Sequence, residues 1–293
     1  MEALSSFLQL LIGGLATGAL YGMVAIGFVL LWQTSSTINF AQGELVMLPA
    51  FLMVLFHVML HWPFLLALLC TMVVCGLFGL AMQRGLVQPL IKEGVLVIVL
   101  ATLGLSLLLR YAALVFWTPQ VLFFPKIFSH TPIRLGGVII TSEDFWVVFI
   151  ASAMILGLWL FIKRTKVGKA MQAVAQNRDT AALLGIRVVS LIGVTFVVNA
   201  VLTAAAGILI APIYFVRWDM GLFLGLKAFY AAIIGGFNQI HGALVGGLLV
   251  GLIETLCAAY LSNSYRDVYV LAFLFLVLML KPDGLVGVRQ VRY

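Results

Sequence analysis

The sequence predicts an all-α fold, a polytopic transmembrane helical bundle of about eight or nine spans, some of them discontinuous. Hydrophobic residues make up 64% of the 293 positions and charged residues only 9%, whereas soluble domains carry roughly a quarter of charged residues. Mean hydropathy is +1.19. The apolar runs can cross a hydrocarbon core of about 30 Å as helices, and they lack the alternation of barrel strands.

The apolar runs are expected to form a single transmembrane domain over residues 1–293. Two segments, 33–43 and 226–241, carry polar and Gly-rich interruptions where the flanking helices are short, which is typical of discontinuous helices. No cleavable signal peptide is expected, because the first run lacks a basic region before it. The spans are expected at about 8–32, 44–60, 64–82, 95–117, 145–162, 190–212, 226–240, 242–260 and 268–280.

Basic residues are distributed unevenly among the connections, and this orients the bundle. The segment 163–190 carries six basic residues and one acid, Asp179, so the positive-inside rule places it in the cytoplasm. The C-terminal tail from Lys281 is expected on the same side. The connection 118–144 balances its charges and is expected to face outward. The net charge of +7 therefore reflects topology, and nucleic-acid binding, which needs a basic soluble module, is excluded.

Glycines repeat at helical spacing in an early and a late span. Small residues at four-residue spacing leave one helix face without bulky side chains and let helix backbones approach closely in lipid. Packing within one subunit explains such faces, and association with a second membrane subunit is the alternative. The glycines concerned are Gly14, Gly18, Gly22, Gly242, Gly246, Gly247 and Gly251.

The sequence lacks the motifs of metalloproteases, serine hydrolases and nucleotide hydrolases, which indicates a non-catalytic chain. In "HVMLH" at 57–61, Val58 stands where a metalloprotease needs Glu, so His57 and His61 are interpreted as residues of a membrane interface. There is no Gly-x-Ser-x-Gly elbow. "VGKAM" at 167–171 lacks the leading Gly and the hydroxyl of a P-loop. No metal site or cofactor is expected, and Cys70, Cys75 and Cys257 are interpreted as packing residues.

A polar stretch, "TINFAQGEL" at 37–45, interrupts the first apolar runs. An ionisable group at bilayer depth costs about 3 kcal/mol, so it tends to face a bundle interior or an aqueous cavity. The cavity interpretation is favoured for Glu44, with hydration at an interface as the alternative, and neither is favoured for Glu254. A translocation pathway is expected to be lined by Asn39, Phe40, Gln42, Gly43, Glu44 and Glu254.

The basic segment has the composition of two short helices. Gly168 permits a bend, Asn177 can cap the second helix, and Gly185 supplies a left-handed stop. Its apolar side chains exceed the needs of a solvated loop, so it packs either on its own helix ends or in a groove of a cytoplasmic partner. The residues expected to couple this segment to the cytoplasmic partner are Gly168, Lys169, Met171, Ala173, Val174, Asn177, Ala181, Leu184 and Gly185.

Four stretches carry a resemblance that covers nearly the whole chain. They are "INFAQGEL" at 38–45, "AVAQN" with "AALLGI" at 173–186, "GGFNQIHGALVGGLLVGLIE" at 235–254 and "KPDGLVG" at 281–287. In this order they resemble the membrane permeases of branched-chain amino acid ABC importers, specifically the smaller LivH-type subunit. Gln42 stands where His is common in the family's "INFAHGE", which leaves the cargo open.

The resemblance implies a multi-pass permease of the bacterial inner membrane. It implies a second, LivM-type permease as partner, two cytoplasmic ATP-binding subunits that carry ATP and Mg, and a periplasmic substrate-binding protein. It also implies that residues 168–186 sit in a cleft of the ATPase. The connection 118–144 would then be part of the surface that meets the binding protein.

Two other classes of function are weighed against this one. An ion-coupled secondary transporter or channel for a small polar solute, such as an amide or urea, would use Glu44 or Glu254 as an ion site. The two short helices of the basic segment 163–190 would then have no partner to bind. A membrane-embedded enzyme is a distant third possibility, because no nucleophile, metal site or acid pair is found.

Overall fold

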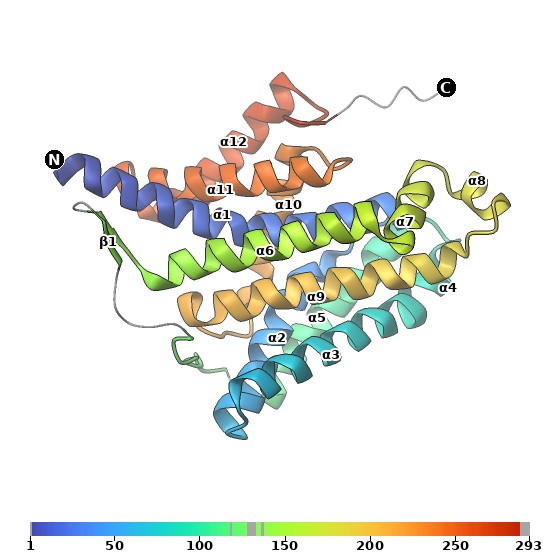
Figure 1. The fold of residues 1–293 in the computed structure, drawn as a ribbon, viewed down its shortest axis with the longest axis horizontal. Helices are drawn as coiled ribbons and strands as arrows, with labels where there is room; N and C mark the ends of the chain where they lie inside the picture. The colour runs from blue at the N-terminus through green and yellow to red at the C-terminus, as the bar shows by residue number, and fades with distance from the viewer. Residues whose placement is uncertain (1, 118, 128–132, 136–137, 288–293) are drawn as a thin grey trace. The chain divides into compact units, whose positions relative to one another are not determined.

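The structure, a computed structural model, describes residues 2–117, 119–127, 133–135 and 138–287. It is dominated by helices, with one short antiparallel hairpin of strands β1 (Ile133–Leu135) and β2 (Val138–Ile140) (Figure 1). The helices are α1 (Glu2–Ser35), α2 (Glu44–Met53), α3 (Phe64–Met82), α4 (Gln88–Leu90), α5 (Val95–Phe116), α6 (Ser142–Arg164), α7 (Lys166–Gln176), α8 (Arg178–Leu183), α9 (Val188–Tyr214), α10 (Met220–Gly235), α11 (Ile240–Tyr260) and α12 (Arg266–Leu280).

Within the described residues, 8 helical segments are long and apolar enough to cross a membrane. Several combine neighbouring elements: the second joins α2 to a 3₁₀ turn at Phe40–Gln42 and a π-helical turn at Val54–Met59. The ninth apolar helix, α10, has 16 residues and therefore rises about 24 Å, short of a full span. These findings confirm the predicted polytopic bundle of eight or nine spans.

The boundaries differ from the predicted ones most clearly at α10. A span is expected at 226–240, but the helix begins at Met220 and ends at Gly235. Gly236 follows with a φ of 106°, a conformation that stops a helix and that only glycine adopts without strain. The predicted interruption is present, and it separates α10 from α11.

The described chain divides into two compact units. Unit 1 comprises Met1–Ile26, Pro125–Ala153 and Leu226–Tyr293, and unit 2 comprises Gly27–Phe124 and Met154–Gly225. Helices α1, α6 and α10 contribute residues to both units.

Unit 1 is assembled through glycine faces on α1, α10 and α11. A Cβ added to Gly18 of α1 would lie 2.8 Å from Leu248 Cα of α11, and one added to Gly247 of α11 would collide with the backbone of Gly22. Another face of α11 carries Gly246, where a Cβ would strike the Ala231 carbonyl of α10. Glycines thus let α11 approach two helices at backbone distance.

The C-terminal segment of unit 1 closes the end of α10. The backbone N–H of Leu285 donates to Ile234 O at 2.8 Å, and that of Val286 donates to Gly235 O at 3.1 Å. Helix C-termini leave their last carbonyls without intrahelical partners. The tail therefore satisfies two carbonyls at the end of the short helix.

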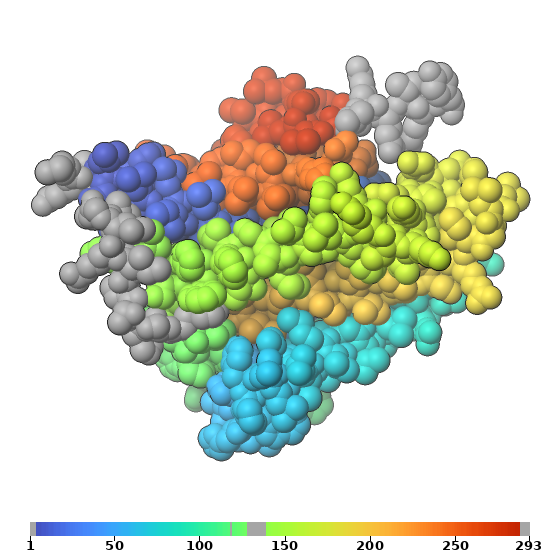
Figure 2. All heavy atoms as spheres, viewed as in Figure 1, coloured from blue at the N-terminus to red at the C-terminus, as the bar shows by residue number. Residues whose placement is uncertain are grey.

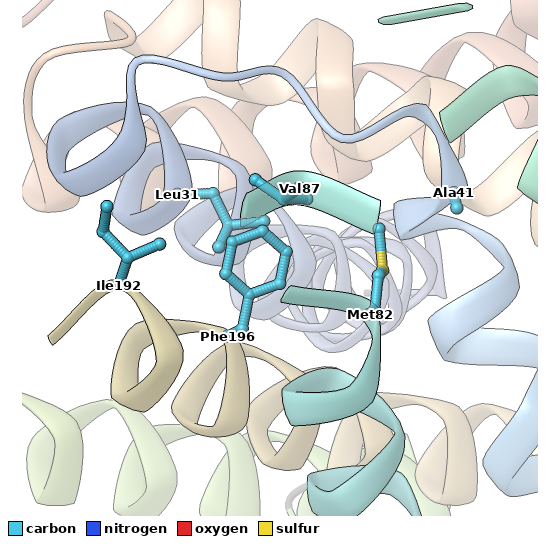
Figure 3. Packing of buried hydrophobic residues seen from close by; sticks show 6 residues of the cluster. All are labelled: Leu31, Ala41, Met82, Val87, Ile192 and Phe196. Carbon is cyan, nitrogen blue, oxygen red and sulfur yellow. The ribbon is translucent and has the colours of Figure 1, made fainter. Parts of the chain in front are cut away.

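The core of unit 2 forms where α3 and α9 lie side by side (Figure 1). Gly79 of α3 permits the contact, since its added Cβ would lie 2.7 Å from Phe196 O of α9. The ring of Phe196 occupies the centre of a buried cluster (Figure 3). The cluster consists of Leu31, Ala41, Met82, Val87, Ile192 and Phe196.

Candidate functional site: a polar break beside buried ion pairs

The polar stretch lies where the helical backbone is broken. α1 ends at Ser35, Ser36 has a φ of 47°, and helical structure resumes only at Phe40. The side chain of Asn39 caps the short 3₁₀ turn, because its Oδ1 accepts from Ala41 N at 3.0 Å. The discontinuity predicted at 33–43 is therefore confirmed, and it occupies residues 36–39.

Two amide side chains face each other within unit 2. Gln42 Nε2 donates to Asn199 Oδ1 at 2.8 Å, and Asn199 Nδ2 returns a bond to Gln42 Oε1 at 2.9 Å. Gln42 Nε2 also reaches Thr203 Oγ1 at 3.1 Å. All three side chains are fully buried. Gly27 makes room for the pair, since its Cβ would overlap both amides.

Helix α5 presents a polar stripe to the break. Thr102, Ser106 and Arg110 follow one another at four-residue spacing, so they share one face of the helix. Thr102 Oγ1 accepts from Phe40 N at 3.2 Å. Ser106 Oγ donates to Glu44 Oε1 at 2.9 Å, and Arg110 Nη2 lies 2.8 Å from the same oxygen.

Glu44 and Arg110 thus form an ion pair at membrane depth. Their side chains are 1% and 12% exposed. Glu44 is the first residue of α2, where the helix dipole favours a negative charge. Pairing offsets part of the large desolvation cost that either charge would have alone.

The loop between α9 and α10 adds a second ion pair near this one. Arg217 Nε lies 2.9 Å from Asp219 Oδ1, and Arg217 Nη2 binds Asp219 Oδ2, so the contact is bidentate. The hydrogen bond from Arg217 lowers the pKa of Asp219, and the charge of Arg110 lowers it further. Trp218 stacks against Tyr111, with ring centroids 6.3 Å apart.

Glu254 belongs to unit 1 and has its own partners there. Lys227 Nζ lies 2.5 Å from Glu254 Oε1, and Tyr21 OH donates to Glu254 Oε2 at 2.9 Å. Lys227 also pairs with Asp267 at 3.1 Å. Glu254, Lys227 and Tyr21 are buried, while Asp267 is exposed.

Arg110, Lys227 and Asn199 are not among the pathway residues predicted from the sequence. An ionisable side chain at bilayer depth needs a partner, and this holds for basic side chains as well as for the two acids. Arg110 and Lys227 each interrupt an apolar helix and could have been recognised in this way, whereas Asn199 needs the helix packing to be known.

The basic hairpin consists of α7 and α8, as predicted, but its first bend lies at Thr165. Thr165 Oγ1 donates to Phe161 O at 2.6 Å and accepts from Gly168 N at 2.9 Å, which starts α7 at Lys166. Gly168 lies inside α7 instead of at the bend. A Cβ there would strike the Phe161 and Ile162 carbonyls, so glycine permits the close approach across the bend.

The second half of the hairpin follows the predicted capping pattern. Asn177 Oδ1 accepts from Thr180 N at 2.9 Å and caps α8. Gly185 has a φ of 83° just after Leu184, as expected for a left-handed stop.

One side of the hairpin is buried and its tip is exposed. Met171, Val174 and Ala181 are buried within the chain, and Ala173 is half-buried. Leu183 and Leu184 are 88% and 76% exposed, and the surface at α8, drawn in yellow, is uncovered in Figure 2. Lys169 is exposed as well.

A hydrogen bond links the hairpin to the polar break. Arg178 Nη2 donates to Ser36 Oγ at 3.0 Å. Ser36 is the residue with positive φ at which the helical path of α1 stops. The first residue of α8 and the start of the break are thus in direct contact.

His57 and Cys75 each contact neighbouring residues of the chain. His57 Nδ1 lies 2.9 Å from Trp62 O, and Cys75 packs in a small cluster with Leu52 and Ala204. Among the described residues, no group of three His, Cys, Asp or Glu side chains could hold a metal ion.

Comparison with known proteins finds a family and several relatives that are transport permeases. The family described as branched-chain amino acid transport system, permease component, matches residues 10–280. The high-affinity branched-chain amino acid transport permease LivH of Escherichia coli is 32% identical over 97% of both chains. The corresponding protein BraD of Pseudomonas aeruginosa is 30% identical over 99% of both. A probable LivH protein of Methanocaldococcus jannaschii is 27% identical over 96% of this chain and 92% of its own. No solved structure was found to match the chain.

Proposed function

The chain belongs to the family of branched-chain amino acid transport permeases, and we propose that it forms the translocation pathway for branched-chain or related hydrophobic amino acids in an ATP-driven importer. The observation that carries this proposal is the match over residues 10–280, together with relatives that match over nearly their whole length. An ion-coupled channel or transporter is disfavoured, because these relatives are named as permeases of branched-chain amino acid transport systems.

ATP is hydrolysed by two separate cytoplasmic chains in this proposal. The support comes from the α7–α8 hairpin, which buries Met171 and Val174 in its own chain but leaves Leu183 and Leu184 exposed. Exposed leucines on a short basic hairpin suit a groove on a soluble partner. The contact between Arg178 and Ser36 supplies a physical link from this partner to the polar break.

The remaining partners follow from the family. We propose a second, LivM-type permease beside this chain and a periplasmic protein that delivers substrate to the outward-facing connection 118–144. Residues 118, 128–132 and 136–137 of that connection lie outside the described residues. The excess of basic residues in 163–190 and in the tail supports a cytoplasmic hairpin and a cytoplasmic C-terminus.

Co-purification tests the role of the hairpin. We expect the wild-type chain to retain its ATP-binding partners, and the double variant Leu183→Gln/Leu184→Gln to lose them because the apolar contact is removed. Leu4→Gln, which changes another exposed leucine, serves as the matched control and should retain them. Retention of the partners by the double variant would show that the leucines do not dock them.

A further inference from the structure

The ion pair between Glu44 and Arg110 is monodentate, because one nitrogen of Arg110 contacts one oxygen of Glu44. Arginine–carboxylate pairs are frequently bidentate, with two parallel hydrogen bonds. Arg217 and Asp219, in the same unit, have this arrangement. Arg110 reaches Glu44 only through Nη2 and only at Oε1.

Within the described residues, one polar atom of each charged side chain, Glu44 Oε2 and Arg110 Nε, is therefore left without a hydrogen-bond partner, and these two atoms are called the open arms of the ion pair. Both atoms are buried. A buried polar atom without a partner costs about 1–3 kcal/mol, and more when it is charged. The neighbouring amide pair of Gln42 and Asn199 is reciprocally bonded. Among the described residues the only other buried side-chain atom without a partner is the neutral Thr71 Oγ1, so both charged ones belong to this ion pair.

One open arm is an anionic acceptor and the other is a cationic donor. We propose that the Glu44–Arg110 pair is a two-charge substrate subsite, in which Glu44 Oε2 accepts from the α-ammonium group of an amino acid and Arg110 Nε donates to its α-carboxylate. This inference rests on the proposed function and names the residues that bind the ammonium group and the carboxylate of the zwitterion. Arg110 is then a specificity-determining residue.

A polar approach to this subsite lies on the α9–α10 loop. The pKa of Asp219 is lowered mainly by the hydrogen bond from Arg217 and also by the charge of Arg110. Trp218 stacks on Tyr111, the neighbour of Arg110. Arg217 and Tyr111 are exposed. Charged and aromatic groups thus extend from the surface to the subsite.

The start of α10 closes the subsite from one side. A Cβ on Gly221 would overlap Glu44 Oε2, and one on Gly225 would lie 2.8 Å from Gly43 Cα. The backbone at the start of α10 thus lies directly against the Gly43 backbone and the Glu44 carboxylate. The ammonium group reaches Oε2 when these first turns of α10 separate from α2.

Ligand binding to the full-length chain in lipid nanodiscs tests the subsite directly. Thermal unfolding is followed with L-leucine, with L-leucinamide, which lacks the carboxylate, and with 4-methylpentanoate, which lacks the ammonium group. We expect leucine to raise Tm and each analogue to bind at least about tenfold more weakly, since each leaves one buried charge unpaired. An analogue that binds as well as leucine, or a leucine effect that is absent, would overturn the proposal.

Two substitutions should each weaken the binding of leucine but not the binding of the analogue that lacks the matching charge. A purely structural role of the two residues would not produce this difference. Glu44→Gln should weaken leucine binding about tenfold or more while leaving 4-methylpentanoate unaffected, and Arg110→Gln should weaken leucine while leaving leucinamide unaffected. Glu93→Gln makes the same chemical change in an exposed turn and should alter nothing. Unchanged leucine affinity in both folded variants refutes the subsite. If the variants do not fold, the wild-type comparison of the three ligands decides alone.

Leucine uptake by the complete importer separates this inference from the proposed function. Uptake by the wild type, combined with unchanged binding in the variants, refutes the subsite alone. Absence of uptake of every branched-chain and related hydrophobic amino acid by the wild-type importer refutes the proposed function.

Discussion

Three pairs of buried or half-buried polar side chains join different helical segments of this chain. Gln42 pairs with Asn199, Glu44 with Arg110, and Glu254 with Lys227. A polar group inside a bilayer has no water to bond with, so the partner decides whether it is tolerated. Each pair therefore holds two segments that are distant in the sequence.

The Gln42–Asn199 pair gives a prediction for stability. Gln42→Ala removes the acceptor of Asn199 Nδ2 in the interior and should lower the free energy of unfolding by about 1–3 kcal/mol. Denaturant titration in mixed micelles measures this value. Gln176→Ala, at an exposed position of α7, is the matched control and should stay within about 0.5 kcal/mol of the wild type. Equal effects of the two substitutions would show that the buried amide contributes nothing.

At the scale of residues, the sequence predicts which side chains are unusual but not with which they pair. Glu44 and Gln42 stand out because they interrupt an apolar run. Their partners Arg110 and Asn199 lie on α5 and α9, so the pairing depends on helix packing that single spans do not encode. The open arms of the ion pair are a matter of geometry and have no signal in the sequence.

Helices in unit 1 approach each other at backbone distance where glycines repeat. Gly14, Gly18 and Gly22 of α1 contact the stretch of α11 that contains Gly247 and Gly251. In lipid, close van der Waals packing replaces the hydrophobic effect as the force between helices. The glycine face is thus a contact surface on which added atoms must collide.

Two glycines of the same helix provide a matched pair for a prediction. Gly18→Ala places a Cβ 2.8 Å from Leu248 Cα and should destabilise the chain by about 1–3 kcal/mol through overpacking. Gly13→Ala meets no atom within 4 Å and should be neutral, or stabilising by up to about 1 kcal/mol through helix propensity. Unfolding in mixed micelles compares the two variants. A Gly18→Ala chain as stable as Gly13→Ala would contradict the packing described.

The C-terminal segment leads to a prediction about truncation. Ending the chain after Leu280 removes the donors that satisfy Ile234 O and Gly235 O, so we expect a large loss of folded protein. Ending it after Gly287 keeps both donors and should preserve the yield. Fluorescence-detected size exclusion of the two truncated chains measures the difference. Equal yields of folded protein would refute a capping role for residues 281–287.

At the scale of elements, long apolar helices could be predicted and the ends of short ones could not. Uniform apolar runs define α3, α5 and α9 within a few residues. The end of α10 is set by Gly236 and by the tail, a contact between segments about fifty residues apart. Thr165 shifts the hairpin bend in the same way, through a cap that the apolar pattern does not reveal.

At the scale of the whole molecule, the proposed function makes the chain a membrane conduit and assigns the energy for transport to other chains. The sequence predicts the membrane bundle from composition and the family from four stretches, and the family match over residues 10–280 confirms both. The hairpin, the Arg178–Ser36 contact and the ion pair at Glu44 form the proposed route from the motor to the substrate.

The most direct test of this account is leucine uptake into vesicles that contain the chain with its permease and ATP-binding partners, with the binding protein outside. We expect uptake only when ATP is enclosed on the cytoplasmic face, and no loss of uptake when ionophores collapse the ion gradients. Vesicles with this chain alone should accumulate no leucine. Gradient-driven accumulation by the chain alone, at the rate of the complete assembly, would contradict the account.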